Sequence, residues 1–256
     1  MIVQLRTRRG GHGEPTLLLL HGLGATGDVW QGCFDLLADR WPGRWLAPDL
    51  PGHGGSAPIR RYSFGATAAC VADLVGPDEP VVVLGHSMGG VVGLALASGW
   101  FGVRVEAVVA LGVKVAWTPD ELDRARSLAD RPVTWFGSRE EAAARYLRVS
   151  GLAEVLDVRD AAVDAGIREE GGRWRLAQDP ATFGVGAPDM AGLLTAAQAR
   201  VLLARGEHDR MVTHQQLTAL DPAAVTLPGL GHNAHVEDPA VVMTLLDPLL
   251  PGASRP

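Results

Sequence analysis

One serine in this sequence has the surroundings that a nucleophile needs. Ser87 lies between two glycines in the segment GHSMG at residues 85–89, directly after the apolar run at 81–84. The glycines allow a sharp turn from a buried strand into a helix, which holds the hydroxyl out for attack on a carbonyl carbon. Because the pattern often arises by chance, this chemistry depends on partner residues elsewhere in the chain.

The base that would take the serine proton is predicted to be His232. It ends the segment GLGH at 229–232, after a predicted strand at 224–227 and before the last predicted helix. A histidine on a glycine-flanked loop past a strand end can reach the top of a sheet. His235 is the nearest rival, and we interpret it as a packing or capping residue because the next four residues are typical of a helix start.

The carboxylate that would orient this base is predicted to be Asp209. It follows the buried-type strand at 201–205, and an α/β sheet gathers its functional loops at the carboxyl ends of its strands. Glu207 is the alternative acid. The strand at 105–111, another common place for the acid, ends in Gly112 instead.

Two backbone N–H groups, those of Leu23 and Met88, are candidates for stabilising an oxyanion. The strand at 17–20 runs into HGLG at 21–24, so the Leu23 N–H could face the developing charge together with that of Met88. A phosphate loop is disfavoured because its Gly-Lys-Ser/Thr segment is missing. We interpret DLPGHG at 49–54 as a structural turn below the site, with Asp49 bonded to neighbouring backbone.

The elements that must position these residues alternate along the chain. Short apolar runs and amphipathic stretches follow one another, which predicts an α/β fold with a mostly parallel, doubly wound sheet. Strands are predicted at 2–7, 16–21, 44–48, 81–85, 105–111, 201–205 and 224–227, and helices at 28–39, 64–74 and 239–250.

The alternation stops between residues 114 and 192. This stretch is charged and predicts helices at 119–130 and 138–149, with Thr118 before the first and Ser138 at the start of the second as capping residues. We predict a helical cap at 114–192, inserted into a core made of 1–113 and 193–256.

Composition excludes several other classes of protein. The 256 residues are 47% hydrophobic and 20% charged, as in a globular protein with a substantial core. A net charge of -6 without a basic patch argues against nucleic acid as a partner.

The apolar runs are far shorter than the about 20 residues of a membrane span, and no secretory signal is seen, so we expect a cytoplasmic protein. The cysteines, Cys33 and Cys70, are expected to be buried thiols, and no metal or other cofactor is expected.

Taken together, the motifs resemble those of the α/β-hydrolase-fold serine hydrolases over essentially the whole chain. The order Ser, Asp, His is that of this family. The resemblance implies Ser87 as nucleophile, His232 as general base and then acid, and Asp209 as its orienting carboxylate. It also implies oxyanion donors at Leu23 and Met88, and a cap that shapes substrate access. A serine at 87 disfavours the relatives that use an aspartate nucleophile.

The reaction predicted on this basis is hydrolysis of a small ester, lactone or thioester through an acyl-serine intermediate. Alternatives are a carbon–carbon bond hydrolase of ring-cleavage type, an acyltransferase or lyase with the same triad, and a non-catalytic ligand receptor. Carbon–carbon bond hydrolysis would need a cationic residue for a substrate carboxylate. The cap offers candidates that the sequence does not place: Arg124, Arg126, Arg145 and Arg148. The partner is expected to be a small molecule with an acyl group, contacted by His21, Trp30, Trp117 and Trp135.

Overall fold

A seven-stranded sheet forms the centre of the molecule in the computed structural model, which describes residues 3–249. The strand order is β1-β3-β2-β4-β5-β8-β9, with β1 antiparallel to β3 and all other neighbours parallel. The strands are β1 (Thr7–Gly10), β2 (Thr16–Leu20), β3 (Trp45–Pro48), β4 (Val81–His86), β5 (Val105–Leu111), β8 (Arg200–Gly206) and β9 (Val225–Leu227). The α/β-hydrolase fold predicted from the motifs is therefore present.

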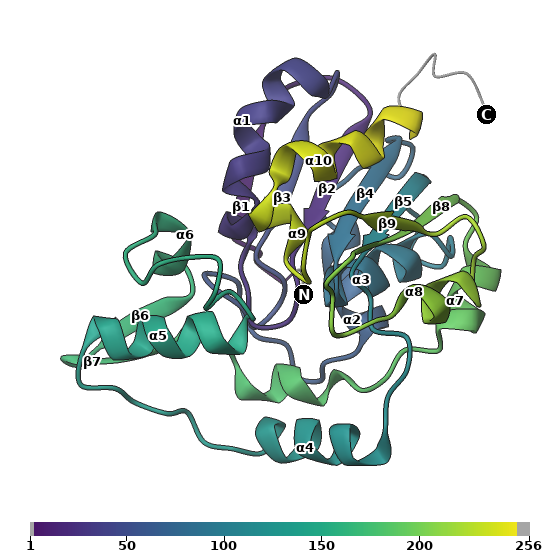
Figure 1. Cartoon of the computed structure of the whole chain (residues 1–256). Helices are drawn as coiled ribbons and strands as arrows, with labels where there is room; N and C mark the ends of the chain where they lie inside the picture. Colours follow the sequence, from purple (N-terminus) through teal and green to yellow (C-terminus); the bar gives the residue numbers. More distant parts are fainter. Residues whose placement is uncertain (1–2, 250–256) are drawn as a thin grey trace.

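Helices cover both faces of this sheet (Figure 1). One face carries the 3₁₀ helix η1 (Gly27–Trp30), α1 (Gln31–Arg40), α9 (Ala234–Glu237), α10 (Pro239–Met243) and the 3₁₀ helix η3 (Thr244–Leu249). The opposite face carries α2 (Phe64–Ala72), α3 (Met88–Leu96), α7 (Met190–Ala196) and α8 (His214–Thr218).

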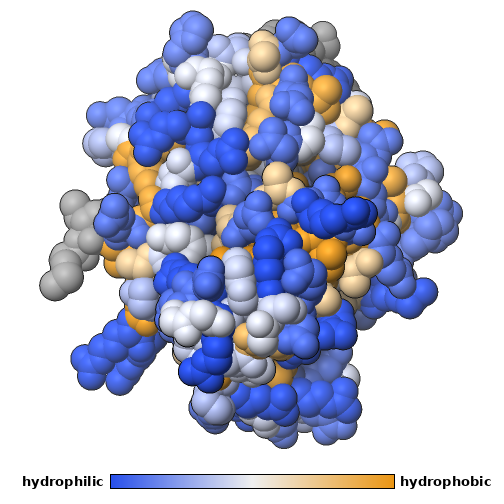
Figure 2. Space-filling view, turned by 90° about the vertical axis from the view of Figure 1, so that its left-hand side faces the viewer, coloured by the Kyte–Doolittle hydropathy of each residue, from blue (hydrophilic) through white to orange (hydrophobic). Residues whose placement is uncertain are grey.

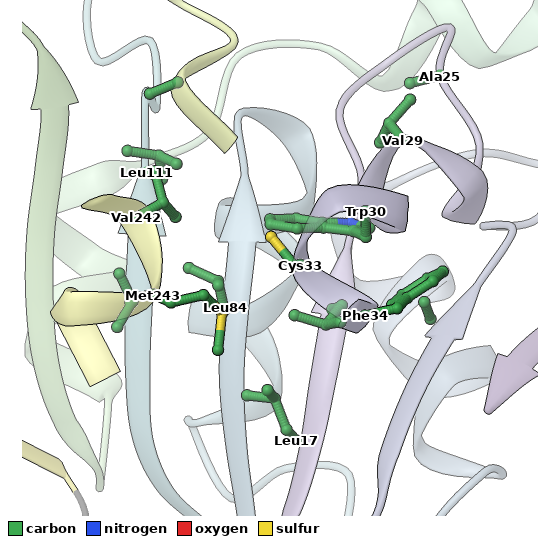
Figure 3. Close-up of a cluster of buried hydrophobic side chains, with 14 of the residues drawn as sticks. Leu17, Ala25, Val29, Trp30, Cys33, Phe34, Leu84, Leu111, Val242 and Met243 are labelled. Carbon is green, nitrogen blue, oxygen red and sulfur yellow. The ribbon is translucent and has the colours of Figure 1, made fainter. Parts of the chain in front are cut away.

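Alternation along the strands builds one core under each helical layer. In β2, Leu17 and Leu19 belong to the cluster under α1, whereas Leu18 and Leu20 belong to the cluster under α3. Successive side chains of a strand point to opposite faces, so a strand covered on both sides is apolar throughout. Figure 3 shows the first cluster, where η1 and α1 pack on the central strands.

The chain leaves the sheet between β5 and β8. The insertion contains α4 (Pro119–Ala129), α5 (Arg139–Val149), α6 (Ala161–Asp164), the hairpin of β6 (Ile167–Glu170) and β7 (Arg173–Leu176), and the 3₁₀ helix η2 (Pro180–Val185). Figure 1 shows α4, α5 and the hairpin grouped at the lower side of the molecule. The hairpin is absent from the sequence prediction, and the predicted boundary at residue 192 falls inside α7, whose Met190 packs in the core cluster under α3.

Two predicted elements at the chain ends differ in the structure. The first strand begins at Thr7, because residues before it bond to the 49–57 loop: Asp49 N–H donates to the Arg6 carbonyl and Ala57 N–H to that of Gln4. The last predicted helix is α10 followed by η3, which contains Pro248. A proline inside a helix removes a donor and disrupts the α-helical ladder. The predicted ends at residues 2 and 250 lie outside the described residues.

Hydrophilic residues dominate the side of the molecule that lies at the left in Figure 1, as Figure 2 shows. No helix within residues 3–249 is long and apolar enough to cross a membrane. Cys33 and Cys70 are both buried free thiols, as predicted.

Candidate active site

Ser87 occupies the turn between β4 and α3 in a strained backbone conformation. Its φ of 49° and ψ of -115° make it the one non-glycine residue with positive φ among residues 3–249. A side chain on Gly85 would collide with the Gly89 carbonyl, so only glycine fits the inside of the turn. Such strain costs about 1–3 kcal/mol and persists only where the surroundings hold it. Here the Ser87 N–H donates to the Leu111 carbonyl at 2.8 Å.

A hydrogen bond of 3.0 Å joins His232 Nδ1 to Asp209 Oδ2. The Asp209 side chain is fully buried, and its other oxygen accepts from the Met211 N–H at 2.7 Å. Because a carboxylate accepts, Nδ1 carries the proton and Nε2 is the nitrogen available as a base. No hydrogen bond within residues 3–249 joins the Ser87 hydroxyl to His232; such bonds often shorten only when substrate binds.

Sequence reasoning missed two residues that hold this pair in place. Gly112 has a φ of +64°, and a Cβ there would lie 3.2 Å from Asp209 Oδ2 and 3.3 Å from His232 Nδ1. Arg205 is buried, and its guanidinium donates to three carbonyls of the 207–212 loop at 2.9–3.1 Å. The sequence features that could have indicated them are the glycine that stands in place of an acid after β5 and the arginine near the end of the apolar strand β8.

The backbone N–H groups of Leu23 and Met88 both lack an acceptor within the described part of the chain. The loop's next N–H groups are used: Gly24 donates to His53 Nε2 at 3.2 Å, and Ala25 donates to the carbonyl three residues earlier. Met88 is the first residue of α3, and the first N–H groups of a helix have no acceptor within it, so they are available to a ligand. Leu23 and Met88 line the same cavity as Ser87, an arrangement suited to accepting an oxyanion.

Two buried histidines, His21 and His53, support the loop at residues 21–25. His21 Nε2 accepts from the Leu50 N–H at 2.8 Å, and His53 Nε2 accepts from Gly24, so both rings must be neutral at Nε2. Burial lowers the pKa of His21 to about 4 and that of His53 to about 3. Asp49 accepts from the Gly27 and Gly55 N–H groups, so it is bonded to neighbouring backbone as predicted.

Two further buried histidines lie behind His232. His86 donates from Nε2 to the His232 carbonyl at 2.9 Å, and burial lowers its pKa well below the usual value. His235 lies between the rings of Trp30 and His86, with centroids 4.4 and 4.3 Å away, and burial lowers its pKa to about 3. His235 is thus a packing residue, as the helix start after it predicts.

A cavity of about 500 Å³ contains Ser87 and His232. It lies where five strands end, because residues that follow each strand line it: Leu23 after β2, Ser87 after β4, Lys114 after β5, Met211 after β8 and His232 after β9. Helix α4 and the η2 segment of the insertion form much of the opposite wall. Among residues 3–249, no group of three or more His, Cys, Asp or Glu is placed to hold a metal ion.

Of the four predicted substrate contacts, Trp117 alone lines this cavity. Trp30 is fully buried in the core cluster under α1, where Figure 3 shows it beside Cys33. Trp135 lies away from the cavity under the Arg173 guanidinium, 4.8 Å from its ring centre. His21 is buried beneath the loop and bonded to Leu50. An aromatic side chain at helical spacing is compatible with a core position as well as with a pocket position, and Trp30 lies in the core.

Three of the four cap arginines named in the sequence analysis line this cavity. Arg124, Arg126 and Arg148 line it, together with Lys114, whereas Arg145 borders a separate small hollow. Lys114 forms an ion pair with Glu121, which also closes the capping box of α4 with Thr118.

Comparison with known proteins identifies the family. Residues 17–245 match the model of the Alpha/beta hydrolase family. The chain belongs to this family. One relative matches over nearly the whole chain: a 2-succinyl-6-hydroxy-2,4-cyclohexadiene-1-carboxylate synthase of Enterobacter sp. is 30% identical, covering 98% of this chain and 97% of the synthase. Other relatives match over less. An uncharacterized protein of Mycobacterium bovis is 41% identical over 86 residues, and the match spans 25% of its length.

Solved structures share the fold of this alpha/beta hydrolase. E-2-(acetamidomethylene)succinate hydrolase superposes with a TM-score of 0.78 at 22% identity, covering 95% of this chain and 94% of that one. The thioesterase domain from the curacin biosynthetic pathway superposes with a TM-score of 0.77 at 22% identity, covering 95% of both chains. At such identities the likeness concerns the fold.

Proposed function

We propose that this alpha/beta hydrolase cleaves a small carboxylic ester, lactone or thioester through an acyl-serine intermediate. The observation that carries the proposal is the combination found at one cavity. A serine in a strained turn shares that cavity with a histidine whose Nδ1 is bonded to a buried carboxylate.

The reaction would proceed in two halves. His232 Nε2 takes the Ser87 proton while Oγ attacks the carbonyl carbon, and the oxyanion accepts from the N–H groups of Leu23 and Met88. Protonated His232 then gives its proton to the leaving alcohol or thiol, which leaves an acyl-serine. Water, deprotonated by the same histidine, releases the acid and restores the serine. Asp209 holds the ring orientation and stabilises the imidazolium formed in each half.

Labelling with a fluorophosphonate tests the nucleophile. We expect one label per folded chain, located on Ser87 by peptide mass spectrometry. Ser87→Ala should prevent labelling and lower kcat on 4-nitrophenyl esters by about 10⁴-fold or more. Ser127→Ala, an exposed serine on α4, is the matched control and should change neither. A folded protein that is not labelled, or is labelled elsewhere, contradicts the proposal.

Substitution of two histidines tests the base. His232→Gln should abolish turnover near neutral pH, because no other histidine among residues 3–249 has a ring nitrogen bonded to a carboxylate. His235→Phe should retain most of the activity, since His235 is packed in the core. The opposite result would make His235 the base.

A second candidate is elimination or carbon–carbon bond cleavage by the same triad. It is favoured by the cationic lining of the cavity and by the match to a synthase whose named product is a cyclohexadiene carboxylate. Labelling of Ser87 without turnover of any ester in a chain-length series would favour this candidate over ester hydrolysis.

A further inference from the structure

The cavity is cationic although the chain is acidic. The chain has a net charge of -6, but among the described residues the cavity is lined by four cationic side chains and by one carboxylate, Glu121. The four are Lys114, Arg124, Arg126 and Arg148. A concentration of one sign of charge at a cleft attracts ligands of the opposite sign and raises their association rate.

Two of these cations already have partners inside the protein. Lys114 pairs with Glu121, and Arg126 pairs with Asp123 at 2.8 Å. Within residues 3–249, Arg124 and Arg148 form no ion pair. Their guanidinium groups therefore have donors available for a ligand, and a guanidinium binds a carboxylate or phosphate through two parallel hydrogen bonds.

The two arginines come from different elements, and both are exposed residues that line the cavity. Arg124 lies on α4, one turn before Leu128, which lines the same cavity. Arg148 lies in the last turn of α5 beside Val149, and Val149 packs so closely on the loop at residues 21–25 that only a glycine fits at position 24. Arg148 is therefore held near this loop by the contact that its neighbour Val149 makes with it.

We infer that Arg124 and Arg148 recognise a carboxylate or phosphate group that the substrate carries away from the bond to be cleaved. The inference rests on the proposed function. Apolar side chains also line the cavity, among them Leu122, Phe183 and Val185. The substrate class is therefore an ester or thioester that carries both an apolar segment and an anionic group.

Three chromogenic esters of matched length test this. 4-Nitrophenyl hexanoate is neutral, mono-4-nitrophenyl adipate carries a carboxylate on the acyl chain, and 3-carboxy-4-nitrophenyl hexanoate carries it on the leaving group. The measured quantity is kcat/KM of each variant divided by that of the wild type, because this ratio cancels differences in intrinsic reactivity. Arg124→Gln and Arg148→Gln should each lower the ratio about 3- to 10-fold for one anionic ester, mainly through KM. The ester affected shows on which side the anion binds.

The neutral ester provides the internal control, and its kcat/KM should stay within about 2-fold in both variants. Arg131→Gln is the matched control, because it removes the same charge from an exposed arginine of the insertion that does not line the cavity. It should leave all three ratios near one.

Two outcomes overturn the inference while the proposed function stands: ratios near one for all three esters in both arginine variants, or an equal loss on all three esters. Failure of the wild type to cleave any ester would instead count against the proposed function.

Discussion

Replacing His235 with phenylalanine is expected to make the protein less sensitive to acid. The folded chain keeps His21, His53 and His235 out of water, and burial lowers their pKa values to about 4, 3 and 3. In the unfolded chain each titrates near its usual pKa of about 6.5. Below that pH the unfolded state binds protons that the folded state does not, so stability is complete above pH 6.5 and falls as the pH drops towards 3–4.

The size of the effect follows from these pKa values. Between pH 8 and pH 5, a histidine whose pKa falls from about 6.5 to 4 or below lowers the free energy of unfolding by about 2 kcal/mol. The three histidines together account for about 6 kcal/mol, which is comparable with the entire stability of many domains, about 5–15 kcal/mol. His86 acts in the same direction, because burial lowers its pKa too.

His235 is the most suitable of these to replace. It packs between two rings, and its Nδ1 is buried without a hydrogen-bond partner in the described structure, so an apolar ring loses no bond there. Urea unfolding at pH 8 and pH 5, followed by tryptophan fluorescence, gives the decrease in unfolding free energy for each variant. The decrease should be about 2 kcal/mol smaller in His235→Phe than in the wild type. Any change in packing is present at both pH values and cancels.

His214→Asn is the control, since that side chain is exposed, and it should show the wild-type decrease. If His235→Phe also showed the wild-type decrease to within about 0.5 kcal/mol, His235 would have to bind a proton in the folded protein. The reasoning from burial would then be refuted.

Two further substitutions test the residues that position His232 and Asp209. Gly112→Ala should lower the free energy of unfolding by about 1–2 kcal/mol because of the positive φ, and should lower kcat about 10-fold because the new Cβ displaces Asp209 from His232. Urea unfolding and ester turnover measure these two effects, and an unchanged kcat would contradict the role of Gly112. Arg205→Met should lower the free energy of unfolding by about 3 kcal/mol, because three carbonyls of the 207–212 loop lose their donor, and should change kcat more than KM. Arg205→Lys should recover part of the stability and part of kcat. A methionine variant with wild-type stability and activity would rule out this role for Arg205.

The central sheet could be predicted because its strands are apolar runs with sharp ends. The predicted strands at 81–85 and 105–111 match β4 and β5 to within a residue, since both are buried on two faces. The edge strand β1 could not be found this way. It contains Arg8 and Arg9, which are suited to an exposed edge, and the more apolar residues before it bond to a loop instead. The hairpin of β6 and β7 was hidden for the same reason, because half of its residues are charged.

The candidate site could be predicted to the extent that it depends on topology. Parallel strands end at one edge, so residues that directly follow β2, β4, β8 and β9 meet there whatever the detail of the loops. The contributions of Gly112 and Arg205 could not be predicted. A glycine that leaves room and an arginine that bonds to carbonyls have no chemistry of their own, and their roles depend on contacts between segments far apart in the chain.

Substrate identity is hidden from the sequence for a related physical reason, which α4 illustrates. Leu122, Ala125 and Leu128 recur at helical spacing, the pattern of a face that packs on a core. In the structure α4 buries none of its residues completely, and this apolar face lines the cavity. A face that awaits a ligand and a face that packs on protein have the same periodicity, because both exclude water. Only the three-dimensional position of the helix, whose apolar face lines the same cavity as Ser87, distinguishes the two cases.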